Sequence, residues 1–212
     1  MKKFIVIDGF DGSGKDSQSK FIFEMYKNKL SKDNETIEEK VVFRSNPETD
    51  NYFGIISHKS LLKDGKIHKI IATVFFAFDI FRSLILYYHR SDVLIFSRYL
   101  LASAYFPKKM VKPVYKFFSF ILPTSEYMFY LDLSPEIAME RITSRNVSID
   151  QEFQIFENQK ALMKSRKKAD LISSNWIKID GSKSKEEIKD EIQNILLNNS
   201  YNRECKSYYF NK

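Results

Sequence analysis

The sequence predicts an α/β fold in which helices cover both faces of a parallel sheet. Short apolar runs typical of buried strands alternate along the chain with longer stretches of helical periodicity. A glycine-rich loop also joins the first apolar run directly to the first helical stretch. The 212 residues, of which 43% are hydrophobic, are enough for one domain with a sizeable core. We therefore expect a single domain over residues 1–197 and a mobile tail over 198–212.

Five apolar runs are predicted to form the strands. Each run is short, and helical stretches separate the runs, which favours parallel pairing between them. In chain order the predicted strands are Phe4–Ile7, Val41–Phe43, Val93–Phe96, Tyr127–Leu131 and Trp176–Ile179.

Helices are predicted where apolar residues recur at helical spacing. The charged segment 31–40 is expected to be a surface connection between the first helix and the second strand. The predicted helices are Lys15–Leu30, Ile67–Arg90, Pro135–Arg145, Asp150–Lys168 and Glu186–Leu197.

The segment from Gly9 to Lys15 reads GFDGSGK and matches the pattern G-x-x-x-x-G-K between a strand and a helix. Glycines allow such a backbone to form a nest of N–H groups that converge on anionic oxygens, and the helix N-terminus adds positive potential. A glycine-rich turn with an ordinary surface lysine is the alternative, but the flanking strand and helix favour phosphate binding. The residues expected to hold ATP are Gly9, Gly12, Ser13, Gly14, Lys15, Asp16 and Ser17.

Two positions depart from the usual magnesium-binding pattern of such loops. The residue after the lysine normally supplies a hydroxyl group, and here it is Asp16. A carboxylate normally follows the strand that ends at Phe96, and here the residue is Ser97. Because magnesium accepts both kinds of oxygen, the two residues would bind it with their roles exchanged. In the alternative, Asp16 faces away and metal binding is weakened.

These motifs together resemble those of the thymidylate kinase family over most of the chain. The segment FIVIDGFDGSGKDSQ, residues 4–18, is similar to the family's first strand and phosphate loop. Arg44 with Pro47, and the tripeptide at 97–99, stand where the family has an arginine with a proline and its Asp-Arg-Tyr. Further similar segments are FYLDLSPE at 129–136, ERI at 140–142, IDG at 179–181 and SKEE at 184–187.

The resemblance implies a three-layer P-loop kinase fold, ATP with Mg²⁺ as donor, and a nucleoside monophosphate as acceptor, with dTMP the leading one. It implies that Arg44 and Arg98 hold the acceptor phosphate, a task that suits the guanidinium fork, although surface ion pairs would also explain them. It further implies a mobile lid near 145–152. The residues expected to act in catalysis are Lys15, Asp11, Arg98 and Arg145, and by the resemblance Asp11 would also lie near the acceptor sugar.

The region expected to bind the acceptor base resembles the family less closely. Phe76 matches the family's stacking ring, and Asp79 with Arg82 would supply a charged pair on the same helix. Tyr105 lies in a stretch that is one residue shorter than the family's. An aromatic stripe at this spacing is more often core than base platform, so both interpretations of Phe76 stay open.

Charge leaves two other classes of function open. A net charge of +7 suits nucleotides, nucleic acid or an anionic membrane. The lysine-rich segment 108–117 would suit an RNA surface, but a charged helix face explains it as well, so we consider nucleic acid an unlikely partner. The alternatives are a non-catalytic nucleotide- or RNA-binding protein, and a kinase of a nucleoside or other small metabolite.

Location and assembly follow from the apolar segments. The longest, at 70–86, contains Asp79 and Arg82, which argues against a membrane span, and the N-terminus does not resemble a signal peptide. We expect a cytoplasmic protein with no membrane partner. The family resemblance suggests a homodimer through the apolar helix at 67–88.

Overall fold

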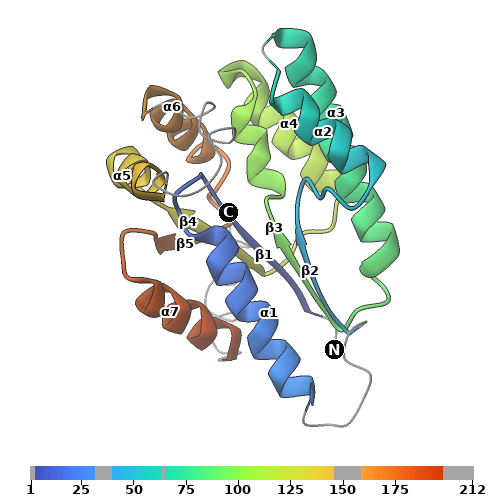
Figure 1. The fold of residues 1–212 in the computed structure, drawn as a ribbon, viewed down its shortest axis with the longest axis vertical. Coiled ribbons are helices and arrows are strands. Elements are labelled where there is room, and N and C mark those ends of the chain that lie inside the picture. Colours follow the sequence, from blue (N-terminus) through green and yellow to red (C-terminus); the bar gives the residue numbers. More distant parts are fainter. Residues whose placement is uncertain (1–2, 32–39, 64, 146–158, 198–212) are drawn as a thin grey trace, which may run out of the picture.

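A five-stranded sheet forms the centre of the protein in the computed structural model, which describes residues 3–31, 40–63, 65–145 and 159–197 (Figure 1). All its strand pairs are parallel, and their order is β2-β3-β1-β4-β5. The predicted α/β class with a parallel sheet is therefore confirmed. The strands are β1 (Lys3–Gly9), β2 (Val41–Ser45), β3 (Val93–Ser97), β4 (Tyr127–Asp132) and β5 (Ile177–Asp180).

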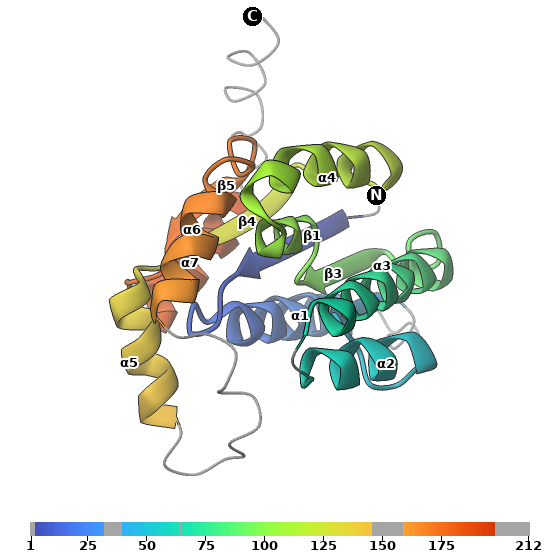
Figure 2. The same ribbon diagram turned by 90° about the horizontal axis from the view of Figure 1, so that it is seen from above.

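Helices cover both faces of this sheet (Figures 1 and 2). On one face α1 and α7 pack on the strands, and on the other lie α3, η1, α4, α5 and α6. Helix α2 packs against α3. The helices are α1 (Lys15–Ser31), α2 (Tyr52–Leu61), α3 (Lys66–Tyr87), α4 (Lys108–Ile121), α5 (Pro135–Arg145), α6 (Gln159–Ala169) and α7 (Lys185–Leu197), with the 3-10 helix η1 at Leu100–Tyr105.

The two core layers follow from side-chain alternation along the strands. In β1, Ile5 and Ile7 are fully buried against the α1 and α7 side. Phe4 and Val6 face the opposite layer. Because both faces are covered, the strands read as continuous apolar runs, which is why the sequence revealed them.

Helices α2 and η1 were not among the sequence predictions. Helix α2 begins at Asn51, whose side-chain oxygen accepts a hydrogen bond of 3.0 Å from the backbone N–H of Gly54. Only Gly54, Ser57 and Ser60 are buried along it, so it lacks the apolar stripe that marks a helix in sequence. The predicted helix at 150–168 is described from Gln159 onwards, and residues 150–158 lie outside the described part.

Helix α3 is long and apolar enough to cross a membrane, with 28% of its apolar window buried. Length and composition alone are weak evidence for a span, since core helices pass the same test. Ile80 and Leu84 belong to the core, and the Asp79 side chain is 0% exposed. The helix therefore packs as part of the fold.

The carboxyl ends of β1, β2 and β3 come together at one edge of the sheet. In the strand register Ser97 lies beside both Ile7 and Ser45. The chain reverses its direction of strand addition between β1 and β3, and ligands of open α/β sheets bind at such a switch point. This edge carries the phosphate loop.

Candidate active site

The phosphate loop has the backbone conformation that its glycines predict. Gly12 and Gly14 have φ angles of 84° and 87°, in the left-handed region that favours glycine. A Cβ at Gly12 would also lie 2.8 Å from the carbonyl oxygen of Ala138. Lys15 is 3% exposed and begins α1, so its charge is held inside the loop. The arrangement suits a nucleotide phosphate.

Asp11 joins the lysine of the loop to Arg98, the residue that follows β3. Its Oδ1 atom lies 3.0 Å from Lys15 Nζ and 3.1 Å from Arg98 Nη2. Burial alone would raise the pKa of Asp11, but the charges of Lys15 and Arg98 outweigh it and hold the pKa far below its usual range. One ionised carboxylate thus fixes two cations of the site.

Replacing Asp11 by asparagine is expected to make unfolding less sensitive to acid. A carboxyl group with a lowered folded pKa contributes stability above its unfolded pKa of about 3.9 and loses it as the pH falls. The unfolding free energy of Asp11→Asn should therefore fall less steeply than wild type between about pH 5 and pH 2. Denaturant titrations at each pH measure this, with Asp190→Asn, an exposed change on α7, as control. Parallel wild-type and Asp11→Asn profiles would contradict the assignment.

Arg98 is held in an uncommon backbone conformation. Its φ is 63°, which is rare for a residue with a side chain and marks local strain at the site. Its carbonyl oxygen accepts a hydrogen bond from Asn46 Nδ2 at 3.2 Å, while Asn46 N donates to Ser97 O at 3.1 Å. The turn after β2 and the turn after β3 therefore hold each other in place.

A buried carboxylate, Asp8, supports the same turn from β1. It accepts hydrogen bonds of 2.9 Å from the backbone N–H groups of Gly9 and Tyr99. Burial raises the pKa of Asp8 above its usual value, although both hydrogen bonds and the nearby charge of Lys15 oppose the shift. Asp8 thus ties the start of the phosphate loop to the segment that carries Arg98.

The two unusual residues of the metal pattern lie together. Ser97 Oγ donates a hydrogen bond of 2.9 Å to Asp16 Oδ1, and Ser45 Oγ lies 3.3 Å from the same atom. Burial alone would raise the pKa of Asp16, but Lys15, Arg98 and the bond from Ser97 lower it, so the carboxylate is ionised at neutral pH. One carboxylate and two hydroxyls, all near the phosphate loop, form a donor set that magnesium accepts. Among the described residues no cluster of three His, Cys, Asp or Glu side chains could hold a metal.

A second arginine cluster lies beside Arg98 at the end of β2. Arg44 Nη2 lies 2.9 Å from the carboxylate of Asp50, and Arg82 Nη1 lies 3.9 Å from it. The buried Nε of Arg44 and Nη1 of Arg82 make no hydrogen bond with the residues that the structure describes. Buried donors without acceptors are costly, so the cluster is suited to a bound anion.

Asp79 supports this cluster rather than facing an open site. Its two oxygens accept hydrogen bonds from the backbone N–H of Glu48 at 2.8 Å and from Asn51 Nδ2 at 2.7 Å. The side chain is 0% exposed. In this arrangement Asp79 positions the loop between β2 and α2, which includes Asp50. The sequence placed it beside the acceptor base, and its complete burial leaves it no accessible surface there.

The aromatic residues expected near the acceptor base occupy different environments. Phe76 is partly buried and packs against the core. Tyr105, at the end of η1, is 54% exposed, and its ring meets that of Phe10 in the phosphate loop at 5.9 Å. Of the two, Tyr105 offers more surface to a ligand.

A cavity of about 260 Å³ adjoins the phosphate loop on the side of α5 and α7. Arg141 lines it and bonds to backbone carbonyls, among them Gly181 at 2.8 Å and Gly12 at 3.4 Å. These bonds tie the phosphate loop to the turn after β5. The position beside the loop suits the nucleoside of a donor nucleotide. The lining residues are Ser13, Gly14, Gln18, Arg141, Ser144, Lys183, Ser184, Lys185 and Ile188.

The sequence did not single out Lys183 or Gln18 as site residues. Both line this cavity, and Gln18 Nε2 also donates to Lys185 O at 2.8 Å. Their contribution depends on α7 docking beside α1, which no local motif encodes. Of the lid expected near 145–152, residues 146–152 lie outside the described residues, as does the side chain of Arg145 at the end of α5.

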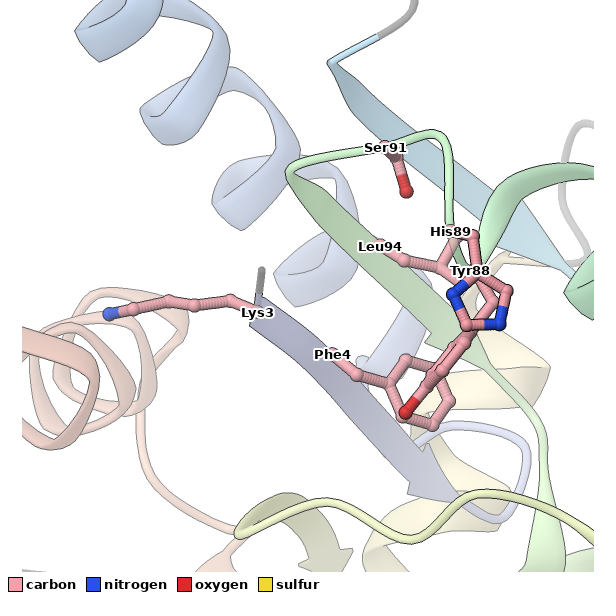
Figure 3. A pocket seen from close by; sticks show the side chains of 6 residues that line it. All are labelled: Lys3, Phe4, Tyr88, His89, Ser91 and Leu94. Atoms are coloured by element: carbon pink, nitrogen blue, oxygen red, sulfur yellow. The ribbon is translucent and has the colours of Figure 1, made fainter. Parts of the chain in front are cut away.

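Another cavity, of about 190 Å³, opens at the opposite edge of the sheet (Figure 3). Residues at the start of β1 and β3 and after α3 line it, including Lys3, Tyr88 and His89. No residue of the phosphate loop lies there. The candidate active site is therefore the carboxyl edge, where cations from three strands converge.

Comparison with known proteins agrees with this geometry. The family model described as thymidylate kinase matches residues 7–192 of the chain. Among solved structures, a thymidylate kinase from Candida albicans has a TM-score of 0.66 at 16% sequence identity, covering 94% of this chain and 92% of that chain. At this identity the likeness shows the fold alone. A comparison with curated protein sequences finds no match.

Proposed function

The chain belongs to the thymidylate kinase family and is an ATP-dependent nucleoside monophosphate kinase, and we propose that dTMP is its preferred acceptor. The family match supports dTMP, and the observation that carries the proposed phosphoryl transfer is the pair of cation sites joined by Asp11. Lys15 lies in the phosphate loop, on the donor side. Arg98 lies beside the arginine cluster, on the acceptor side. An enzyme that joins two anions needs such cations on both sides of the transferred group.

The proposed reaction moves the γ-phosphoryl group from ATP to a phosphate oxygen of the acceptor. The bond from the γ-phosphorus to the bridging oxygen of ADP breaks as the bond to the acceptor oxygen forms, giving ADP and a nucleoside diphosphate. Lys15 neutralises charge on the transferred group, and Arg44 with Arg98 holds the acceptor phosphate in line. Asp11 keeps Lys15 and Arg98 in position through its charge.

Asp50 occupies the place of an acceptor anion in this proposal. Its carboxylate faces Arg44 and Arg82 and is 46% exposed at the side chain, so it is free to move when a phosphate arrives. The acceptor phosphate would take over the guanidinium groups, including the buried donors that make no hydrogen bond with the described residues. Tyr105 is proposed to face the acceptor, while Asp79 holds the loop.

We propose that Asp16 and Ser97 hold Mg²⁺ with exchanged roles. Asp16 would supply the carboxylate and Ser97 the hydroxyl, and their 2.9 Å separation allows both oxygens to approach one ion or its water shell. Bound magnesium would neutralise charge between the β- and γ-phosphates. The ionised state of Asp16 at neutral pH supports the assignment.

A panel of acceptors tests the proposed function directly. ADP release from Mg-ATP is measured by a coupled assay with each nucleoside monophosphate, with nucleosides, and without acceptor. We expect turnover with dTMP to exceed that with other monophosphates. Faster turnover with another monophosphate would keep the reaction and overturn the acceptor. Turnover with a nucleoside alone, or ATP binding without acceptor-dependent turnover, would contradict the monophosphate kinase assignment and favour the corresponding alternative.

Assembly and location complete the proposal. Helix α3 exposes Ile67, Ile70, Val74 and Phe78 by 72%, 63%, 44% and 49%, at spacings that place them on one face. We propose that this face forms a homodimer interface. We further propose a single kinase domain over residues 1–197, a lid near 145–152 and an intracellular location.

A further inference from the structure

Helix α4 carries an apolar strip that faces outwards. Phe120 is 90% exposed, Phe117 61%, Met110 48% and Ile121 40%. With the exposed Pro113, they recur at the spacing of one helical face. The buried Val111 and the partly buried Phe118 fill the separate face of the helix that packs on the core. The exposed strip is therefore not needed to attach α4 to the sheet.

A strip of lysines runs beside the apolar one. Lys109, Lys112 and Lys116 each come one residue before a member of the apolar strip, and all three are exposed. Successive helical residues point about 100° apart, so the two strips lie next to each other on the outer surface. Lys108 adds a fourth charge, and the helix contains no acidic residue.

Helix α6, which packs on η1 as α4 does, is also positively charged. Helix α6 lies on the same side of the sheet as α4 and carries no acidic residue over Gln159–Ala169. Its Lys164 and Lys167 are exposed. Lys168 Nζ donates to Phe106 O at 3.0 Å, next to the start of α4. Figure 2 shows α4 at the outside of the molecule, where no other labelled element lies beyond it.

We propose that α4 docks the enzyme on an anionic lipid surface. Protruding phenylalanines beside lysines, without acidic residues, are typical of helices that lie in a membrane interface. The phenylalanines would enter the headgroup region while the lysines bind lipid phosphates and carboxylates. This departs from the expectation that the protein has no membrane partner, which rested on the absence of a spanning pattern. It does not depend on the identity of the acceptor.

Charge and shape together favour lipid over the other occupants. RNA would use the lysines, but two phenylalanines beside a methionine and an isoleucine present far more apolar surface than phosphate contacts require. A second copy of the chain would bring four further lysines to the same interface in a symmetric pairing about this strip, with no acidic partner on the helix. A flat anionic lipid surface would bind the lysine strip by charge and bury the apolar strip at the same time.

Sedimentation with vesicles tests the proposal on the full chain. Vesicles of equal parts phosphatidylserine and phosphatidylcholine are compared with phosphatidylcholine alone. We expect binding to the anionic vesicles only, weakening as salt rises. Lys112→Gln/Lys116→Gln should reduce the partition coefficient about 25-fold, since each lysine contributes about fivefold. Phe117→Ala/Phe120→Ala should reduce it at least about tenfold.

Matched variants elsewhere on the surface control for charge and apolarity. Lys59→Gln/Lys69→Gln removes the same charge from α2 and α3, and Leu61→Ala/Leu62→Ala removes exposed apolar side chains at the end of α2. Both should bind vesicles as wild type does. Because α4 places none of its exposed residues in the active site, Phe117→Ala/Phe120→Ala should keep its thermal unfolding midpoint and its kinase activity.

Insertion has its own optical readout. Phe120→Trp places an indole at the most exposed position of the strip, while the native Trp176 is 5% exposed. Its emission should shift to the blue with anionic vesicles. No vesicle binding by wild type, or binding unaffected by both α4 double variants, would overturn the proposal. Lysine-dependent binding of single-stranded RNA without vesicle binding would replace lipid by nucleic acid. Loss of a dimer in Phe117→Ala/Phe120→Ala, again without vesicle binding, would replace it by a second copy.

Discussion

Replacing Lys15 by methionine is expected to lower kcat by about 10³-fold, because it removes the cation nearest the transferred phosphoryl group. Lys15 is 3% exposed and begins the helix after the phosphate loop. Methionine keeps the apolar stem and removes the charge, so packing changes little. In the free enzyme Asp11 then retains Arg98 as its cation. The measurement is steady-state turnover with Mg-ATP and dTMP.

The comparison with another lysine shows whether the effect is specific. Lys20→Met on the exposed side of α1 removes the same charge without touching the loop and should leave kcat unchanged. Binding of ATP by Lys15→Met is measured by calorimetry, and its unfolding midpoint by calorimetric heating. A fall in kcat of less than about tenfold in a folded variant would contradict the role of Lys15.

Exchanging Asp16 and Ser97 in one double variant is expected to restore the kcat that each single substitution lowers. Asp16→Thr leaves only hydroxyls and no carboxylate at the metal position, which weakens magnesium binding. Ser97→Asp places a second carboxylate against the first, where the serine oxygen now lies 2.9 Å away, and like charges at that distance oppose each other. We expect each single variant to lose about 10²-fold in kcat. The double variant should recover to within about tenfold of wild type.

Metal affinity gives a readout that does not depend on turnover. Mn²⁺ is titrated into each variant with ADP, and free Mn²⁺ is followed by electron paramagnetic resonance. The single variants should bind Mn²⁺ about 10-fold to 100-fold more weakly, and the double variant close to wild type. Thr124→Ala is the control, because it removes an exposed hydroxyl before β4, away from the site, without changing charge. If the double variant binds Mn²⁺ no better than the weaker single, the exchange is wrong.

The sequence predicted the parts of the site that are encoded in contiguous residues. The phosphate loop is such a part, because glycine positions, the lysine and the start of α1 occupy one short segment whose backbone preferences are local. The strands were also readable, since burial on both sides makes each one continuously apolar. The departure at Asp16 and Ser97 was visible as two residue types in unexpected places.

The contacts between distant segments could not be read from the sequence. Asp16 and Ser97 are 81 residues apart, and only the pairing of β3 beside β1 and the position of α1 bring their oxygens to 2.9 Å. Asp50 meets Arg44 and Arg82 because α2 packs on α3. The burial of Asp79 depends on the same packing. The sequence shows which residues can carry a charge, but it does not show which residues pair with them.

The sequence by itself therefore determined the α/β class, the phosphate loop and the two classes of charged residue that phosphoryl transfer requires. The tertiary structure decided the strand order, the placement of α2 and η1, and the partners of the arginines. It also decided that one strip of α4 faces outwards while another packs on the core. The physical reason is that backbone preference and apolar periodicity act over a few neighbouring residues. Pairing of buried charges depends on which elements share a face, and that is settled only when the whole sheet and its helices pack together.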